Sequence, residues 1–168
     1  MSQEMIDIII VDDHEIFRNG LKMVINKLKY ARVIGEAANG KEFIQLLRKK
    51  EPHMVFMDIE MPVMNGIEAT RKALEDYPDL KIAALTMFND EAYIESMLEA
   101  GARGFLLKNI NKDDLEQAIR SIARGHTYYS NELWTSLRER LKTIINPVRM
   151  KSLLPGERWK SSSYWVKA

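Results

Sequence analysis

Five polar side chains stand directly after short apolar runs in this 168-residue chain. They are Asp12, Asp13, Asp58, Thr86 and Lys108. If the runs are parallel strands, their carboxyl ends meet at one edge of a sheet, and the five side chains gather there. Three clustered carboxylates repel one another and need a cation. Ligation by oxygen alone favours Mg²⁺.

A metal, an amine and a hydroxyl around one carboxylate are the groups that phosphoryl transfer requires. The metal and Lys108 would neutralise the charge of the incoming group, and the Thr86 hydroxyl would donate to it. Asp58 would then be the nucleophile and form an acyl phosphate. A single Asp after a strand is usually a turn residue or a helix cap, but agreement at several strand ends argues against independent turn residues. His14 lies where the first helix begins, and we interpret it as a polar residue of the cap region.

Along the chain, short apolar runs alternate with amphipathic stretches whose apolar residues recur at helical spacing. Short apolar runs predict five strands, at 6–11, 32–37, 53–57, 81–85 and 105–107. Amphipathic stretches predict five helices, at 15–29, 41–50, 67–77, 90–100 and between Asn111 and Gly125. The alternation predicts an α/β fold with a five-stranded parallel sheet, doubly wound, and helices on both faces. The strand order 2-1-3-4-5 makes the first and third strands neighbours, which brings Asp12, Asp13 and Asp58 together.

Composition excludes several classes of protein. The chain has no Cys, so it has no disulfide, thiolate metal site or cysteine nucleophile. Its first apolar run is too short for a signal peptide or a membrane span, and we expect a cytoplasmic protein with no membrane partner. The net charge of +1 divides into −4 over residues 1–125 and +5 over residues 126–168. Such asymmetry is compatible with a nucleic-acid segment or with a merely solvated tail.

The pattern changes after Gly125. We expect residues 1–125 to form one domain and residues 126–150 to form a linker with a helix from Ser130 to about Ile145. Within the linker, 126–129 is interpreted as a turn. Residues 151–168 show neither periodicity nor a core, and they are interpreted as a short tail.

Four segments of the predicted domain resemble the receiver domain of two-component response regulators, which has the flavodoxin-like and CheY-like fold. They are Ile-Ile-Val-Asp-Asp-His over 9–14, Met-Asp-Ile-Glu-Met-Pro-Val-Met-Asn-Gly over 57–66, Leu-Thr-Met over 85–87 and Gly-Phe-Leu-Leu-Lys over 104–108. The resemblance covers about residues 5–125. It is specific, because order, spacing and strand context all agree.

The resemblance implies that a sensor histidine kinase phosphorylates Asp58. It implies Mg²⁺ held by Asp13, Asp58 and the backbone carbonyl of Glu60, with Asp12 assisting. It also implies that Thr86 and Phe105 form a switch pair, in which phosphate draws Thr86 inward and the aromatic ring follows. Phe105 lacks the hydroxyl of a Tyr, so packing alone would drive its rotation, and plain core packing is the alternative interpretation.

The segment 125–130 and the following helix resemble the linker of the NarL/FixJ subfamily, which continues into a LuxR-type helix-turn-helix domain. Only eighteen residues follow Met150, so we expect that domain to be incomplete and sequence-specific DNA binding to be negligible. The tail is either a frameshift product or a genuine truncation. Two alternatives remain for the function. One is a stand-alone receiver that signals through contacts with a partner protein; the other is a Mg²⁺ phosphatase with an aspartyl nucleophile and Glu60 as acid. Separately, a homodimer is an expected assembly of the chain.

Overall fold

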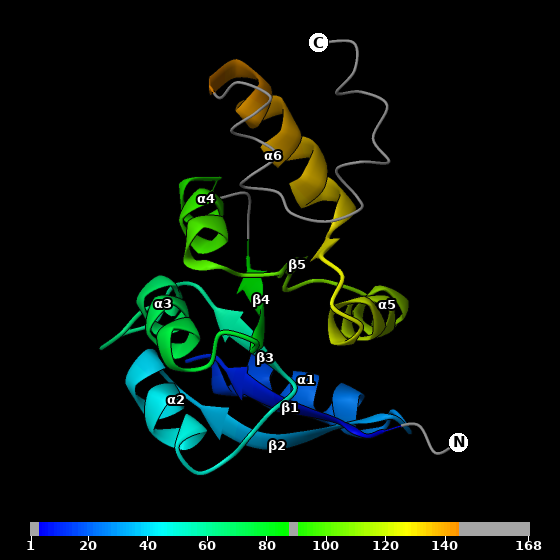
Figure 1. The fold of residues 1–168 in the computed structure, drawn as a ribbon. Helices are drawn as coiled ribbons and strands as arrows, with labels where there is room; N and C mark the ends of the chain where they lie inside the picture. The colour runs from blue at the N-terminus through cyan, green and yellow to red at the C-terminus, as the bar shows by residue number, and fades with distance from the viewer. Residues whose placement is uncertain (1–3, 88–90, 145–168) are drawn as a thin grey trace.

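A computed structural model describes residues 4–87 and 91–144 as a three-layer α/β fold. One parallel sheet runs in the order β2-β1-β3-β4-β5-β6, with helices on both faces (Figure 1). The strands are β1 (Ile6–Val11), β2 (Ala31–Ala37), β3 (Met54–Asp58), β4 (Lys81–Thr86), β5 (Gly104–Leu107) and β6 (Tyr128–Tyr129). The helices are α1 (Glu15–Asn26), α2 (Gly40–Leu47), α3 (Gly66–Asp76), α4 (Glu91–Ala100), α5 (Lys112–Ala123) and α6 (Asn131–Ile144). No helix within these ranges is long and apolar enough to cross a membrane.

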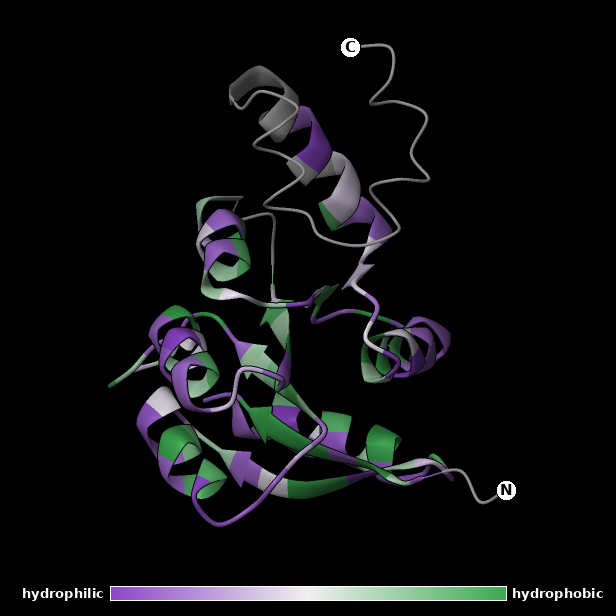
Figure 2. Cartoon of the chain, in the orientation of Figure 1, coloured by the Kyte–Doolittle hydropathy of each residue, from purple (hydrophilic) through white to green (hydrophobic). Residues whose placement is uncertain are grey.

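Alternate side chains of the central strands enter two separate cores. Ile8 and Ile10 of β1 pack with the apolar faces of α1 and α5. Ile9 and Val11 face the other side and pack with α2, α3 and α4. This two-residue alternation explains why the central strands are apolar at nearly every position. Figure 2 shows apolar strands between helices whose outer faces are hydrophilic.

The predicted α/β class and parallel sheet are confirmed, but the number of strands is wrong. The first five strands have the predicted order, and β6 adds a sixth beside β5. Residues 128 and 129, interpreted as part of a turn, therefore form a short strand. The physical reason is the free edge of β5: the Tyr128 N–H donates to the Arg103 carbonyl at 3.1 Å, and the Ser130 N–H donates to the Phe105 carbonyl at 2.9 Å.

Helix starts match the sequence signals more closely than helix ends do. Asn39, Asn65 and Asn111 are N-caps, and each side chain accepts a hydrogen bond from the backbone N–H three residues later. The first helix ends at Asn26 instead of the predicted 29. Its last turn tightens there, since the Leu28 N–H donates to the Ile25 carbonyl. The predicted end of the linker helix at 145 and the tail 151–168 lie outside the described residues.

Candidate functional site

Neighbouring strands place two buried aspartates side by side. The parallel register pairs Val11 of β1 with Met57 of β3. The next residues along the two strands are Asp12 and Asp58, whose residues are 0% and 5% exposed. Two carboxylates at this depth are stable in their ionised forms only when positive charge lies close to them.

Lys108 supplies that positive charge from the end of β5. Its Nζ lies 2.7 Å from Asp12 Oδ2 and 3.3 Å from Asp58 Oδ2. The Lys108 side chain is only 5% exposed, and its ammonium group lies 4.9 Å from the centroid of the Phe17 ring. The backbone N–H of Lys108 donates to the carbonyl of Thr86 at 2.8 Å, which fixes the end of β5 against the end of β4. The lysine is therefore held in place at both its backbone and its side chain.

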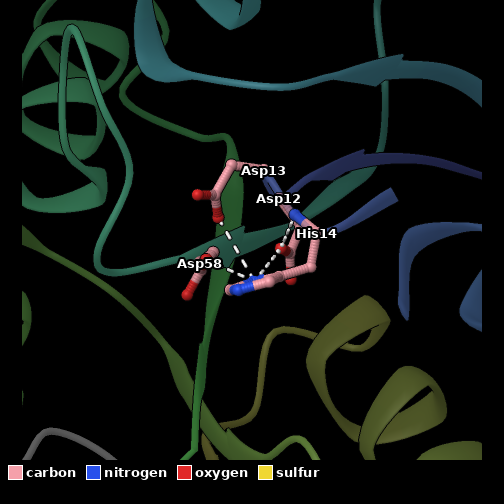
Figure 3. Close-up of side chains that lie close together, drawn as sticks. All are labelled: Asp12, Asp13, His14 and Asp58. Atoms are coloured by element: carbon pink, nitrogen blue, oxygen red, sulfur yellow. Dashed lines mark hydrogen bonds and ion pairs between the residues drawn. The ribbon is translucent and has the colours of Figure 1, made fainter. Parts of the chain in front are cut away.

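His14 brings an imidazole to the same cluster. Its Nδ1 lies 3.1 Å from Asp12 Oδ1, 3.3 Å from Asp13 Oδ1 and 4.0 Å from Asp58 Oδ2 (Figure 3). His14 occupies the N-cap position of α1, as a cap-region residue should, but its side chain makes no capping hydrogen bond. The sequence interpretation missed the position of its ring inside the cluster. The only signal for it was the place of His14 directly after two strand-end aspartates.

Burial and charge together perturb the acidity of Asp58. Burial raises the pKa of the Asp58 carboxyl, the negative charge of Asp12 raises it further, and Lys108 opposes both effects, leaving the pKa at about 7. Further positive charge close to this carboxyl would stabilise its ionised form and lower its pKa. The electrostatics of the site therefore favour the binding of a cation.

The donor set fits a divalent cation. One ligand atom from each of Asp12, Asp13, His14 and Asp58 lies within 4.8 Å of all the others. Carboxylate oxygens are the ligands that hard divalent ions prefer, and the close carboxylates are not fully neutralised by one lysine. A cation would complete the charge balance of the cluster.

Two further predicted site residues, Thr86 and Glu60, lie at the same edge of the sheet. A hollow of about 140 Å³ lies over Asp58 and is lined in part by Glu60, Thr86, Tyr93 and Lys108. Thr86 ends β4 and is 7% exposed. Glu60 lies two residues after β3 and is exposed. The hollow thus brings a hydroxyl, an amine and a buried carboxylate around one open space.

The loop after β3 approaches the backbone of Asp58 closely. A Cβ on Gly66 would lie 2.1 Å from the Asp58 carbonyl oxygen, and the Gly66 N–H donates to the Ile59 carbonyl at 2.8 Å. In the same loop, Val63 has a φ of 70°, in the left-handed region that a β-branched residue rarely adopts. The tight loop holds the acidic cluster next to the start of α3.

Phe105 lies outside the polar cluster, in the apolar core on one face of the sheet. Its side chain is 0% exposed and stacks on Tyr129, with ring centroids 5.5 Å apart and an interplanar angle of 6°. Tyr129 in turn contacts Trp134 of α6, with ring centroids 5.3 Å apart. Sequence reasoning missed this aromatic stack of Phe105, Tyr129 and Trp134, because it joins a strand, a segment interpreted as a turn and the linker helix.

Comparison with known proteins agrees with this geometry. Residues 8–120 match the response regulator receiver domain. The chain is 33% identical to the transcriptional regulatory protein DegU of Brevibacillus brevis over 152 residues, covering 90% of this chain and 64% of that protein. It is 40% identical to the oxygen regulatory protein NreC of Staphylococcus carnosus over 131 residues, covering 77% and 60%.

Solved structures show the same fold. A two-component response regulator of the LuxR family from Aurantimonas sp. SI85-9A1 aligns with a TM-score of 0.77 and 33% identity, covering 82% of this chain and 98% of that one. The chain spans about three fifths of the length of the curated relatives it matches. The match to the domain covers most of this chain, including every strand end that carries the cluster. The chain therefore belongs to the response regulator receiver domain family.

Proposed function

We propose that this protein accepts a phosphoryl group on Asp58 from a sensor histidine kinase and transmits the change to the control of transcription. The single observation that carries the proposal is the buried Asp58 carboxylate, which lies beside Asp12 and within 3.3 Å of the Lys108 ammonium. The transcriptional part is supported by the similarity to DegU, a transcriptional regulatory protein, and to the LuxR-family response regulator from Aurantimonas.

The chemistry follows from the groups around Asp58. A carboxylate oxygen attacks phosphorus, a P–O bond forms and the P–N bond to the kinase phosphohistidine breaks, with the electron pair staying on the imidazole nitrogen. The Lys108 ammonium holds the ionised carboxylate and then neutralises a phosphoryl oxygen. The Thr86 hydroxyl, which lines the hollow over Asp58, donates to another.

Asp12, Asp13, Asp58 and the backbone carbonyl of Glu60 would hold Mg²⁺. When bound, this ion supplies the positive charge that draws phosphate oxygens toward Asp58. The deep burial of Asp12 suits an assisting role, because its charge is already shared with Lys108 at 2.7 Å. Asp13, which is more exposed, is free to approach the ion directly.

Thr86 and Phe105 would form the switch pair. They lie on the adjacent strands β4 and β5, where Thr86 pairs with Leu107 and Phe105 pairs with Ala84. Inward movement of the Thr86 side chain toward a phosphoryl group would leave space that the Phe105 ring can enter. Plain core packing of Phe105 is the alternative, and replacement of Thr86 by Val distinguishes them, because it removes the hydroxyl and keeps the shape.

We further propose that residues 1–125 are the phosphoaccepting unit, 126–150 the linker and 151–168 a tail. Helix α6 of the linker packs on the unit, since Leu133 and Trp134 are buried in the same core as α4. We also propose a homodimer as an assembly of this chain.

Labelling by acetyl phosphate tests the phosphoacceptor assignment. We expect one phosphoryl group per chain with Mg²⁺, measured by mass spectrometry, and none for Asp58→Ala. Asp79→Ala is the matched control, because Asp79 is exposed and precedes β4, away from the strand ends that carry the cluster. Undiminished labelling of Asp58→Ala would refute the assignment. Steady turnover of a phosphomonoester, in place of a single slow self-hydrolysis, would favour the phosphatase.

A further inference from the structure

His14 places a nitrogen donor inside the acidic cluster. Figure 3 shows its ring nitrogen between the side chains of Asp12, Asp13 and Asp58, with a dashed line to each. The side chain of His14 is 64% exposed, so burial does not force the ring into this position. The backbone N–H of His14 donates to Asp12 Oδ1 at 2.7 Å, which anchors the residue beside the cluster.

The distances fit donors that share one ion. In an octahedral site with bonds of about 2.1 Å, neighbouring donor atoms are about 3 Å apart and opposite ones about 4.2 Å. His14 Nδ1 lies 3.3 Å from Asp13 Oδ1, close to the spacing of neighbours. It lies 4.0 Å from Asp58 Oδ2, close to the spacing of opposite donors. Small side-chain adjustments would therefore let the three atoms bind the same ion.

We propose that His14 Nδ1 is a metal ligand alongside Asp13 and Asp58, and that it shifts the preference of the site from Mg²⁺ toward divalent cations that bind imidazole well, such as Ni²⁺. The inference rests on the proposed function in assuming that the aspartate cluster holds a cation. It adds a residue and a selectivity that the oxygen donors alone would not have.

The physical reason is the chemistry of imidazole. Mg²⁺ binds oxygen donors and keeps several of its waters, so it gains little from a histidine. Ni²⁺ binds imidazole well, and it stands far above Mn²⁺ in the general order of affinity for nitrogen sites. Loss of His14 should therefore weaken Ni²⁺ binding strongly and leave Mg²⁺ binding nearly unchanged.

Metal titration of the full chain measures this selectivity. We expect His14→Ala to weaken Ni²⁺ binding by about tenfold or more in isothermal titration calorimetry, and to change Mg²⁺ binding by less than about twofold. His126→Ala is the matched control, because His126 is exposed and follows the end of α5, where the chain reaches the amino end of β5 and not the carboxyl end that carries the cluster, and it should leave the titration of the cluster unchanged. Equal effects of His14→Ala on both ions would overturn the selectivity.

A second readout examines the bond itself. Electron spin echo envelope modulation of the Mn²⁺-loaded protein should show coupling to a directly bound ¹⁴N nucleus, and His14→Ala should abolish it. If the Nδ1–H instead occupies the place of the cation by donating to the carboxylates, His14→Ala will bind every ion more tightly and the coupling will be absent from the parent protein. That result would refute the proposal.

Asp58→Asn separates this inference from the proposed function. We expect it to weaken Ni²⁺ and Mg²⁺ together, because Asp58 is shared by both ions. If Asp58→Asn leaves both affinities intact, the proposed metal site itself is wrong. If Asp58→Asn weakens both but His14→Ala weakens neither, only the role of His14 fails.

Discussion

Replacement of Asp58 by Asn should stabilise the metal-free protein in a pH-dependent manner. The Asp58 carboxyl has a pKa of about 7 in the folded chain, against an ordinary value of 3.8, because of its burial and the charge of Asp12. Well below pH 4 both folded and unfolded states hold the proton, so the carboxyl adds no pH dependence to stability. Between pH 4 and 7 the unfolded state loses its proton first, so the folded state becomes less stable as pH rises.

The size of the effect follows from that interval. Each pH unit between the two pKa values contributes about 1.4 kcal/mol, and an interval of about three units corresponds to about 4 kcal/mol. An asparagine amide cannot ionise, so the Asp58→Asn variant escapes this loss. The variant and the parent should therefore have similar stability at pH 4, and the variant should be more stable by about 4 kcal/mol above pH 7.

Urea unfolding in the presence of EDTA, repeated from pH 4 to pH 8, measures the difference. Asp79→Asn is the control, because Asp79 is exposed, and its difference from the parent should be flat across the series. A difference for Asp58→Asn that does not change with pH, or a variant that is less stable at pH 8, would refute the electrostatic reasoning.

Three further sites test the surroundings of the cluster. In the same pH series, Asp12→Asn should move the apparent pKa of Asp58 below 7, because Asp12 contributes to raising it; an unchanged midpoint would contradict this. Gly66→Ala should cost about 2 kcal/mol or more and reduce acetyl phosphate labelling, since its Cβ would meet the Asp58 carbonyl oxygen. As its control, Gly20→Ala meets no atom within 4 Å in the middle of α1 and should instead stabilise by about 1 kcal/mol. Tyr129→Ala should cost about 3 kcal/mol in urea unfolding by removing a buried ring, and a cost near zero would show that the aromatic stack contributes little.

Much of the polar cluster could be predicted because parallel strands convert a linear pattern into a spatial one. The positions of Asp12, Asp58 and Lys108 after apolar runs suffice to place them at one edge, whatever the details of the helices between them.

Other features depend on contacts that no local pattern encodes. Two residues are too few to show a strand period, so Tyr128–Tyr129 could not be distinguished from a turn. They form β6 only because α5 returns the chain to the free edge of β5. The direction of the His14 ring was equally hidden, since it is set by carboxylates from two different strands.

The aromatic stack gives the protein an optical probe of its own. Trp134 lies on α6 and Phe105 on β5, and Tyr129 is in contact with both rings. The emission of this indole is therefore sensitive to the packing between the sheet and the linker helix. The chain has two other tryptophans, Trp159 and Trp165. With both replaced by Phe, the fluorescence of a single native side chain would follow the movement of α6 without any attached dye.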